Sequence, residues 1–211
     1  MQPVEIETER LVLRPLQPGD AQAICDICQD PLIQKWTMVP SPYLLSDAET
    51  FISLTTQWWE SDQPTWIMLL KETLTEGAPD ADAATTSAQV AGMISYNNPL
   101  IAGDRGEVGY WANPEHRGKD YTSEALNAII DWGFELGLGA IGWRCEVHDG
   151  VPNYASARVA QKCGFVYDGT IRLEHTNKGK LYDSRIATLT PEDPRTDTCL
   201  LYTSPSPRDA T

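Results

Sequence analysis

The sequence has no apolar stretch long enough to cross a bilayer, and its polar beginning, MQPVEIETER, is not that of a secretory signal peptide. We therefore expect a cytoplasmic protein with no membrane partner. Basic residues are also few, since 16 Lys and Arg stand against 30 Asp and Glu and leave a formal net charge of -14. Such a charge repels nucleic acid and could attract a cationic substrate, although it could also serve solubility or adaptation to salt.

Spacings typical of metal sites are lacking as well. Cys25 and Cys28 form a C-x-x-C pair, but no second C-x-x-C and no H-x-x-x-H follows. Ala21 and Ile24 join these two cysteines in one helical stripe, which favours core packing over a zinc or redox role. Three histidines show no ligand spacing and receive no role: His116, His148 and His175. We expect no metal.

Two nucleotide-binding patterns are excluded by their context. The segment Gly137–Gly142 satisfies G-x-G-x-x-G, but a helix precedes it and a strand follows, which is the reverse of the dinucleotide-binding order. Gly137 is better interpreted as a helix stop. Gly118-Lys119 lacks both the upstream glycine and the following Ser or Thr of a Walker loop.

The last residues differ in character from the rest. Cys199–Asp209, CLLYTSPSPRD, matches residue for residue the translation of a transposase-type sequencing adaptor. We expect one domain over residues 1–193 and a disordered tail over 194–211, in which 199–209 would be an artefact and natural sequence would end near Thr198. A genuine Ser/Pro-rich tail is the alternative.

Hydrophobic periodicity predicts one mixed α/β domain with a substantial core, in the order β-αα-βββ-α-β-α-ββ. The first helix would be capped by Asp20 and stopped by Pro31, and a capping box, Ser46-x-x-Glu49, would open the second. A mobile hairpin loop is expected over 72–87. Predicted strands cover 5–16, 65–70, 89–96, 107–111, 141–147, 166–174 and 181–189, and predicted helices cover 20–29, 46–58, 122–136 and 153–163.

Two segments carry the functional signal. The first, Asn113–Leu126, is a tight basic loop that opens into an amphipathic helix, so unpaired backbone N–H groups and a positive dipole end would face an anion such as a phosphate. The second, Asn153–Phe165, is predicted to be a short helix capped by Asn153 and stopped by Gly164.

These segments resemble the acyl-CoA-binding core of the GNAT superfamily of N-acetyltransferases. The opening Thr8–Pro15 (TERLVLRP), then Gly106–Trp111 (GEVGYW) and the pattern N-x-x-S-x-R-V-A-x-K-x-G-F from Asn153 are similar to the RimJ/RimL branch, which acetylates ribosomal-protein N-termini. The resemblance covers about residues 7–193. It implies the GNAT fold, a mixed and mostly antiparallel sheet with helices on both faces.

The resemblance also implies the site for acetyl-CoA. The pyrophosphate would lie on the backbone N–H groups of the loop and helix start, and the pantetheine arm would lie beside the fourth strand like an additional strand. Asn153 would orient the pantetheine, cap its helix, or do both. For Arg117 and Lys119, free surface charge is the alternative. The implied cofactor-binding residues are Trp111, Ala112, Arg117, Gly118, Lys119, Asp120, Tyr121, Thr122 and Asn153.

The implied reaction is direct attack of an amine in a ternary complex, which needs a base and an acid. Glu107, on the same strand face as Trp111, is the candidate base, and a structural carboxylate is the alternative. Ser156 is the candidate acid, since Ala160 stands where many members have a tyrosine; a helix-start cap is the alternative. Asp120 departs from the Gly or Ala of the family and would either turn outward or weaken CoA binding.

The expected activity is acetyl transfer from acetyl-CoA to a primary amine, either a protein N-terminus or a small molecule. The alternative is a non-catalytic acyl-CoA-binding module, supported by Asp120 and by the missing helix tyrosine. The acceptor would depend on residues 36–43, the second helix and the closing strands, where Trp36 and Tyr43 could line a groove or pack in the core. No pattern fixes the oligomeric state, and a homodimer is allowed for.

Overall fold

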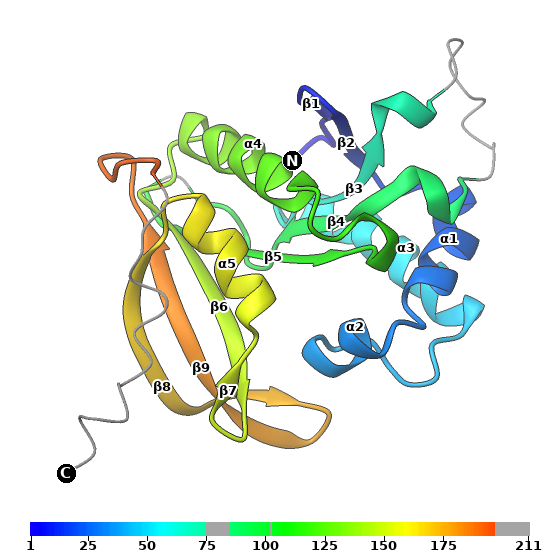
Figure 1. Ribbon diagram of the computed structural model, residues 1–211. Coiled ribbons are helices and arrows are strands. Elements are labelled where there is room, and N and C mark those ends of the chain that lie inside the picture. Colours follow the sequence, from blue (N-terminus) through cyan, green and yellow to red (C-terminus); the bar gives the residue numbers. More distant parts are fainter. Residues whose placement is uncertain (75–84, 102, 197–211) are drawn as a thin grey trace.

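The computed structural model describes residues 1–74, 85–101 and 103–196 (Figure 1). Most of the loop expected over 72–87, and all of 199–209, therefore lie outside the described residues. No helix in the described ranges is long and apolar enough to cross a membrane.

One sheet organises the described part of the chain. Its order is β1-β2-β3-β4-β5-β6-β9-β8, and β7 pairs with β6. All neighbours are antiparallel except β5 and β6, which run parallel. The predicted mixed, mostly antiparallel sheet is thus confirmed. The strands are β1 (Ile6–Glu7), β2 (Leu11–Pro15), β3 (Thr65–Leu70), β4 (Val90–Tyr96), β5 (Arg105–Ala112), β6 (Ala140–His148), β7 (Val151–Pro152), β8 (Val166–Asn177) and β9 (Lys180–Leu189).

Helices cover both faces of this sheet, as predicted (Figure 1). Helices α4 (Tyr121–Glu135) and α5 (Tyr154–Lys162) pack on one face, over a core to which β3 contributes Trp66 and Met68. Helices α1 (Ala21–Ile27), α2 (Pro31–Trp36) and α3 (Leu45–Glu60) pack on the other, over a core that takes Ile67 and Leu69 from the same strand. Successive side chains of this fully buried strand point to opposite faces of the sheet, so β3 contributes to both cores.

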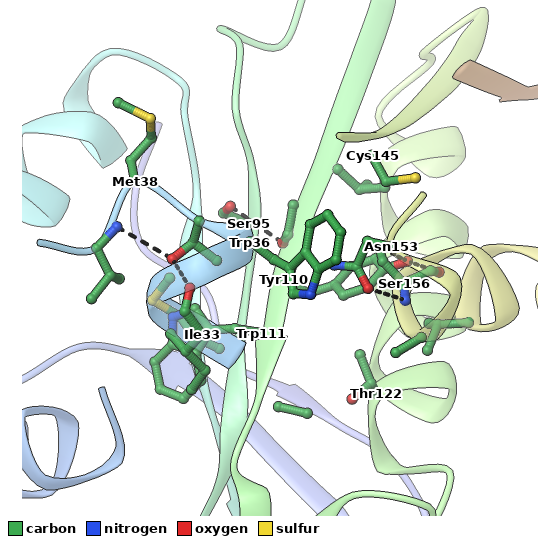
Figure 2. A pocket seen from close by; sticks show the side chains of 18 of the residues that line it. Ile33, Trp36, Met38, Ser95, Tyr110, Trp111, Thr122, Cys145, Asn153 and Ser156 are labelled. Atoms are coloured by element: carbon green, nitrogen blue, oxygen red, sulfur yellow. Dashed lines mark hydrogen bonds between the residues drawn. The ribbon is translucent and has the colours of Figure 1, made fainter. Parts of the chain in front are cut away.

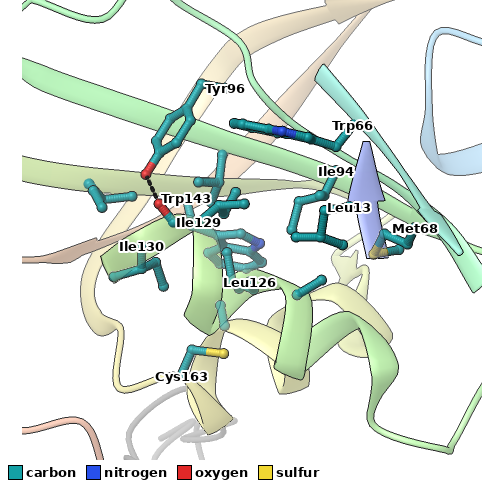
Figure 3. Close-up of a cluster of buried hydrophobic side chains, with 14 of the residues drawn as sticks. Leu13, Trp66, Met68, Ile94, Tyr96, Leu126, Ile129, Ile130, Trp143 and Cys163 are labelled. Carbon is teal, nitrogen blue, oxygen red and sulfur yellow. Dashed lines mark hydrogen bonds between the residues drawn. The ribbon is translucent and has the colours of Figure 1, made fainter. Parts of the chain in front are cut away.

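The larger core depends on the amphipathic stripe of α4 (Figure 3). Leu126, Ile129 and Ile130 are fully buried in it, as their spacing predicted. The hydroxyl of Tyr96 on β4 donates a 2.8 Å hydrogen bond to the carbonyl of Ile129, so a buried polar group is satisfied. Each buried aliphatic side chain contributes about 1.5–3 kcal/mol, which fixes α4 against the sheet.

Glycines end both helices of this face. Gly137 after α4 and Gly164 after α5 have φ values of 89° and 88°, the left-handed region that favours glycine. Leu138 N–H donates to the carbonyl of Gly133, and Phe165 N–H donates to that of Ala160, so both ends have the Schellman pattern. The predicted helix stops are confirmed.

The amino-terminal segment differs from the prediction of one strand over 5–16. The chain turns at Thr8, whose hydroxyl accepts a hydrogen bond from Leu11 N–H at 3.0 Å, and Ile6 then pairs with Leu13. A threonine side chain that satisfies the backbone locally favours such a turn. Asp20 also does not cap α1 with its side chain: it is fully buried and forms a bidentate ion pair with Arg14 at 2.7 and 2.9 Å.

Two helix starts were predicted wrongly. Pro31 begins α2 rather than only ending α1, because Asp30 caps it by accepting from the N–H groups of Leu32 and Ile33 and proline suits the first turn. The start of α3 is held by Asp47, whose side chain accepts from Leu44 N–H at 2.8 Å, rather than by the predicted Ser46 motif.

The C-x-x-C segment packs in the core, as its stripe predicted. Cys28 is buried together with Ala21 and Ile24, and burial raises the pKa of its thiol to about 12. Burial likewise raises the pKa of Cys25, with a contribution from Asp26. Neither thiol is activated, because a thiolate is disfavoured in such surroundings. Across the described ranges, no three His, Cys, Asp or Glu side chains are arranged to hold a metal ion.

Candidate active site

A cleft of about 1020 Å³ opens where two central strands separate (Figure 2). Strands β5 and β6 pair only from Arg105 with Ala140 to Val108 with Trp143. Beyond these pairs, residues 109–112 keep their β4 partners but have no partner in β6. This half of β5 therefore presents a free backbone edge to the cleft, which could accept an extended ligand as an additional strand.

Trp111 and Ala112 lie on this free edge, as predicted. Both line the cleft, and they pair with Met93 and Gly92 of β4 on their other side. The indole of Trp111 packs into the core beneath α1 and α3, so the backbone of this segment is held rigidly. Their predicted role toward pantetheine remains a prediction.

The loop that follows β5 leads directly into α4. Asn113 fixes its start, since its buried side chain accepts from Glu115 N–H and donates to the carbonyl of Val90 at 2.7 Å. Gly118 has φ of 77° with open space around the position of a Cβ, and Asp120 follows at φ of 63°. Gly118 and Asp120 are thus both in the left-handed region. They turn the chain so that the start of α4, at Tyr121, faces the cleft. Sequence reasoning missed Asn113.

Asp120 does not cap α4. Its side chain makes no cap hydrogen bond; it forms an ion pair with Lys162 of α5 and is 58% exposed. The carboxylate is thus directed toward α5 rather than toward the first N–H groups of α4, although Asp120 still lines the cleft; its effect on CoA binding remains a prediction. The first N–H groups of α4, around Tyr121 and Thr122, are left without this carboxylate as a cap, which suits an anion at the helix start.

The two basic loop residues have different partners. Arg117 pairs with Asp30, the cap of α2, at 2.6 Å, so it is not a free surface charge. Burial disfavours the Asp30 carboxylate, but hydrogen bonds from Arg117 and from the α2 backbone outweigh burial and lower the pKa of Asp30. Lys119 lies 3.3 Å from a ring nitrogen of His116. Both cations lie beside the start of α4.

A second contact ties α4 to the amino-terminal strands. Glu124, in the first turn, accepts from the hydroxyl of Thr8 at 2.5 Å and from Arg10 through its backbone N–H at 2.8 Å and its guanidinium at 2.6 Å. Arg10 also donates to the carbonyl of Lys119 and lies over the ring of Tyr121. The motif Thr8–Pro15 thus positions the loop, a role that its sequence did not reveal.

Glu107, the predicted base, lines the cleft and is 12% exposed. Its carboxylate accepts from Arg144 of β6 at 2.8 Å, and Arg144 also pairs with Glu174 of β8. Burial disfavours the charge on Arg144, but the two carboxylates outweigh it and raise its pKa. This network, which sequence reasoning missed, fixes the Glu107 carboxylate at the closed end of the cleft.

Ser156 and Asn153 lie together at the start of α5, and both line the cleft (Figure 2). Asn153 is the cap, since its side chain accepts from Ser156 N–H at 3.2 Å, and Ser156 is therefore not the cap. The Ser156 hydroxyl accepts from the indole N–H of Trp143 at 3.0 Å and donates to Tyr110 at 3.3 Å. Burial raises the pKa of Tyr110 far above that of an ordinary phenol, so its hydroxyl stays protonated.

A further polar cluster lies on the acceptor side of the cleft. Glu146 of β6 is hydrogen-bonded to His148 at 2.6 Å and to the side-chain amide of Asn177 at 2.7 Å, and its carboxylate lies 3.1 Å from Nε2 of His175. The ring of His148 stacks on Tyr182 of β9. No role had been assigned to these histidines. The alternation of Arg144, Glu146 and His148 along one strand was the available signal, because residues two apart share a face.

Comparisons with known proteins agree with this geometry. A family model described as acetyltransferase (GNAT) domain matches residues 10–166. The uncharacterized N-acetyltransferase p20 of Bacillus licheniformis is 28% identical over 178 residues, 83% of this chain and 90% of that protein. The ribosomal-protein-serine acetyltransferase of Escherichia coli strain K12 is 31% identical over 85 residues, 40% of this chain and 45% of that protein.

A solved structure supports the same fold. The microcin C7 self-immunity acetyltransferase MccE, in complex with acetyl-CoA and AMP, has a TM-score of 0.69 and 18% identity, covering 87% of this chain and 93% of that one. The match of the family model over most of the chain, together with the separated parallel strands and the glycine loop at the start of α4, assigns the family. The chain belongs to the GNAT family of acetyltransferases.

Proposed function

We propose that this protein transfers the acetyl group of acetyl-CoA to a primary amine by direct attack within a ternary complex. The observation that carries this proposal is the free edge of β5 leading into the start of α4. An extended arm could pair with residues 109–112, and a phosphate at its end would meet the N–H groups of α4. Acetyl-CoA, which has both features, would supply an activated acetyl group as a thioester.

The residues for holding acetyl-CoA are those predicted from the sequence. Trp111 and Ala112 would bond its extended arm through their backbone, and Asn153 would orient that arm. Residues 117–122 would hold the phosphates through backbone N–H groups. Arg117 and Lys119 belong to this loop, and their positive charges would strengthen phosphate binding. Such a site needs no metal.

Two side chains are proposed for proton transfer. Glu107, held by Arg144, would take a proton during attack through a bridging water, and Ser156 would return one to the leaving thiol. The phenol of Tyr110 accepts from the Ser156 hydroxyl and donates to the Ser156 carbonyl at 2.8 Å, so it would position Ser156 at the start of α5. Glu107 and Ser156 both line the same cleft, so one proton could be removed and another delivered within one ligand space.

The acceptor is proposed to be either a protein N-terminus or a small-molecule amine. The ribosomal-protein-serine acetyltransferase of Escherichia coli, by its name, favours the first. The acidic net charge of -14 suits either class, because both present a cation. The acceptor half of the cleft, beside α2 and α3, includes apolar side chains such as Trp36 and Phe51, so an acceptor with an apolar segment next to its amine fits.

The first test is acetyl-CoA binding to the full chain by thermal shift, with Asp120→Gly and Asp149→Gly compared with the wild type. Asp149 also has a positive φ, of 50°, but does not line the cleft, so it controls for relief of backbone strain. Both variants should gain intrinsic stability, whereas only Asp120→Gly should change the acetyl-CoA shift. If acetyl-CoA raised the Tm of Asp120→Gly but not that of the wild type, Asp120 would block the site, and the non-catalytic binding module would be favoured.

The second test is release of free thiol from acetyl-CoA with a panel of amines that includes an N-terminal serine peptide, spermidine and tyramine. Turnover that falls in Glu107→Gln while acetyl-CoA affinity is retained would support the proposal. Binding without turnover on any amine would contradict it. A Glu107→Gln variant as fast as the wild type would show that Glu107 is structural.

A further inference from the structure

An irregularity in β8 brings two ionisable side chains to the same face of the sheet. Ile171 pairs with Ser184 and His175 pairs with Tyr182. The chain therefore advances four residues along β8 where it advances only two along β9. Within this bulge Leu173 has φ of 52°, which is unusual for a residue with a Cβ, and its N–H donates to the carboxylate of Asp183 at 3.0 Å. Backbone strain of this kind is concentrated at functional sites.

The bulge changes where successive side chains point. In a regular strand Glu174 and His175 would lie on opposite faces. Here Glu174 pairs with Arg144, and Nε2 of His175 lies 3.1 Å from the carboxylate of Glu146; Arg144 and Glu146 are two residues apart on one face of β6. The strained segment therefore delivers a carboxylate and an imidazole to the same wall of the cleft.

Glu146 is built to hold an imidazole. Its side chain is 8% exposed and is fixed from three sides, by His148, His175 and Asn177. The Glu146 carboxylate lies 3.1 Å from Nε2 of His175, so it can stabilise a positive charge on that ring. His175 lines the cleft and is 32% exposed, so it has access to both the ligand space and solvent. His148 lies between Trp36 and Tyr182 and does not line the cleft.

We propose that His175, positioned by Glu146, takes a proton from the ammonium group of the acceptor as it enters the cleft and passes that proton to solvent. This inference rests on the proposed function. The acceptor enters as R-NH₃⁺, and His175 becomes an imidazolium while the neutral amine is formed. The new N–C bond then forms as the C–S bond breaks, the second amine proton ends on the thiol sulfur, and His175 releases its proton, so one proton is released per turnover.

The charges around the pair suit this role. The positive charge on Arg144 is balanced by Glu107 and Glu174. The carboxylate of Glu146 therefore remains to stabilise the positive charge that His175 gains. Glu107 lies near the closed end of the cleft and would act later, during attack. The ionisable groups around the Glu146–His175 pair are His148, which also contacts Glu146, the ion pair of Arg144 with Glu174 beside it on β6 and β8, and Tyr182, the register partner of His175 on β9.

The test compares His175→Gln with His148→Gln, using the N-terminal serine peptide or whichever amine of the panel is acetylated. Base catalysis is worth about 100-fold or more, so kcat/KM for the amine should fall on the order of 100-fold in His175→Gln at pH 6.5. For the peptide the two rates should converge above about pH 9, where its α-amino group, with a pKa of about 7.7–8.0, is already neutral. His148→Gln should follow the wild-type pH profile.

Four outcomes would overturn the inference. Equal loss in His175→Gln at every pH would indicate a structural role, and an unchanged rate would indicate none; in both cases the proposed function would survive. Nitrogen NMR of the His175 ring supplies a reading that needs no acceptor: Nε2–H is expected in the neutral wild type, and an Nδ1–H tautomer would contradict the pair. Absence of turnover with every amine would overturn this inference and the proposed function together.

Discussion

Replacing Glu124 by Gln should loosen the helix that the proposed phosphate site requires. The carboxylate accepts three hydrogen bonds from Thr8 and Arg10, and an amide of the same shape keeps an acceptor oxygen but loses the charge. A neutral hydrogen bond contributes about 1 kcal/mol net, and a charge-assisted one is roughly twice as strong. Arg10 is 43% exposed, so its share is discounted for screening. We expect a loss of about 2 kcal/mol, or about 4–8 °C in Tm.

The loss should depend on pH in one direction. Burial opposes ionisation of Glu124, but hydrogen bonds from Thr8 and Arg10 outweigh burial and lower its pKa in the folded protein. A group with a lowered folded pKa stabilises the protein above its unfolded pKa, about 4.3, and ceases to do so as the pH falls through the folded value. The difference between wild type and Glu124→Gln should therefore be constant from pH 6 to 8 and shrink below about pH 4.

Differential scanning fluorimetry across this pH range measures the effect. Glu135→Gln, at the other end of α4, is the matched control, because no hydrogen bond of its side chain is found within the described residues; its Tm should stay within about 1 °C. The acetyl-CoA shift should also fall in Glu124→Gln, since the start of α4 is less fixed. A variant as stable as the wild type, or a difference that persists below pH 3, would refute the reasoning.

Three further substitutions test separate parts of the site. Asp30→Asn keeps an oxygen to cap α2 but releases Arg117, so Tm should fall by about 2–4 °C while acetyl-CoA affinity, measured by calorimetry, rises a few-fold; weaker binding would show that Asp30 positions Arg117. Ser156→Ala leaves the indole N–H of Trp143 without its acceptor, so stability should fall by about 1–3 kcal/mol in chemical denaturation and turnover by about tenfold; unchanged turnover would remove Ser156 from the chemistry. Gly164→Ala would strain a φ of 88° and place a Cβ 2.9 Å from the carbonyl oxygen of Pro194, whereas Gly179→Ala, at φ of 76°, meets no atom within 4 Å. Gly179→Ala should therefore lose about 1 kcal/mol and Gly164→Ala clearly more, and equal losses would contradict this account.

Local signals predicted the elements around the cofactor half of the cleft. Gly137 and Gly164 marked the ends of α4 and α5, and Asn153 marked the start of α5, because each acts on backbone groups only a few residues away. The motif spacing also placed Arg117 and Glu107 on the cleft. These features depend on short-range chemistry, which a single sequence records.

The ion pairs across elements were beyond the same reasoning. Arg144 of β6 reaches Glu107 on the neighbouring strand β5 and Glu174 on β8, which lies beyond β9, and each pairing depends on sheet order and register rather than on spacing. The strand predicted over 166–174 ended before His175, whereas β8 continues to Asn177. The bulge around Leu173 contains neither glycine nor proline, so the local sequence did not indicate it. A strain held by a distant side chain, Asp183, has no local signature.

Helix α2, which lies where no helix or strand was predicted, connects the two halves of the site. Its first turn is capped by Asp30, whose carboxylate also holds Arg117 of the proposed phosphate loop. Its other end meets the acceptor side, where Asn177 donates to the carbonyl of Thr37 and Trp36 packs against His148. A ligand that draws Arg117 away from Asp30 would therefore act on a six-residue helix with few bonds of its own, too short to be stable in isolation. Binding at the loop should thus be felt at the Glu146–His175 pair through α2, which explains why a helix this short is anchored at both ends.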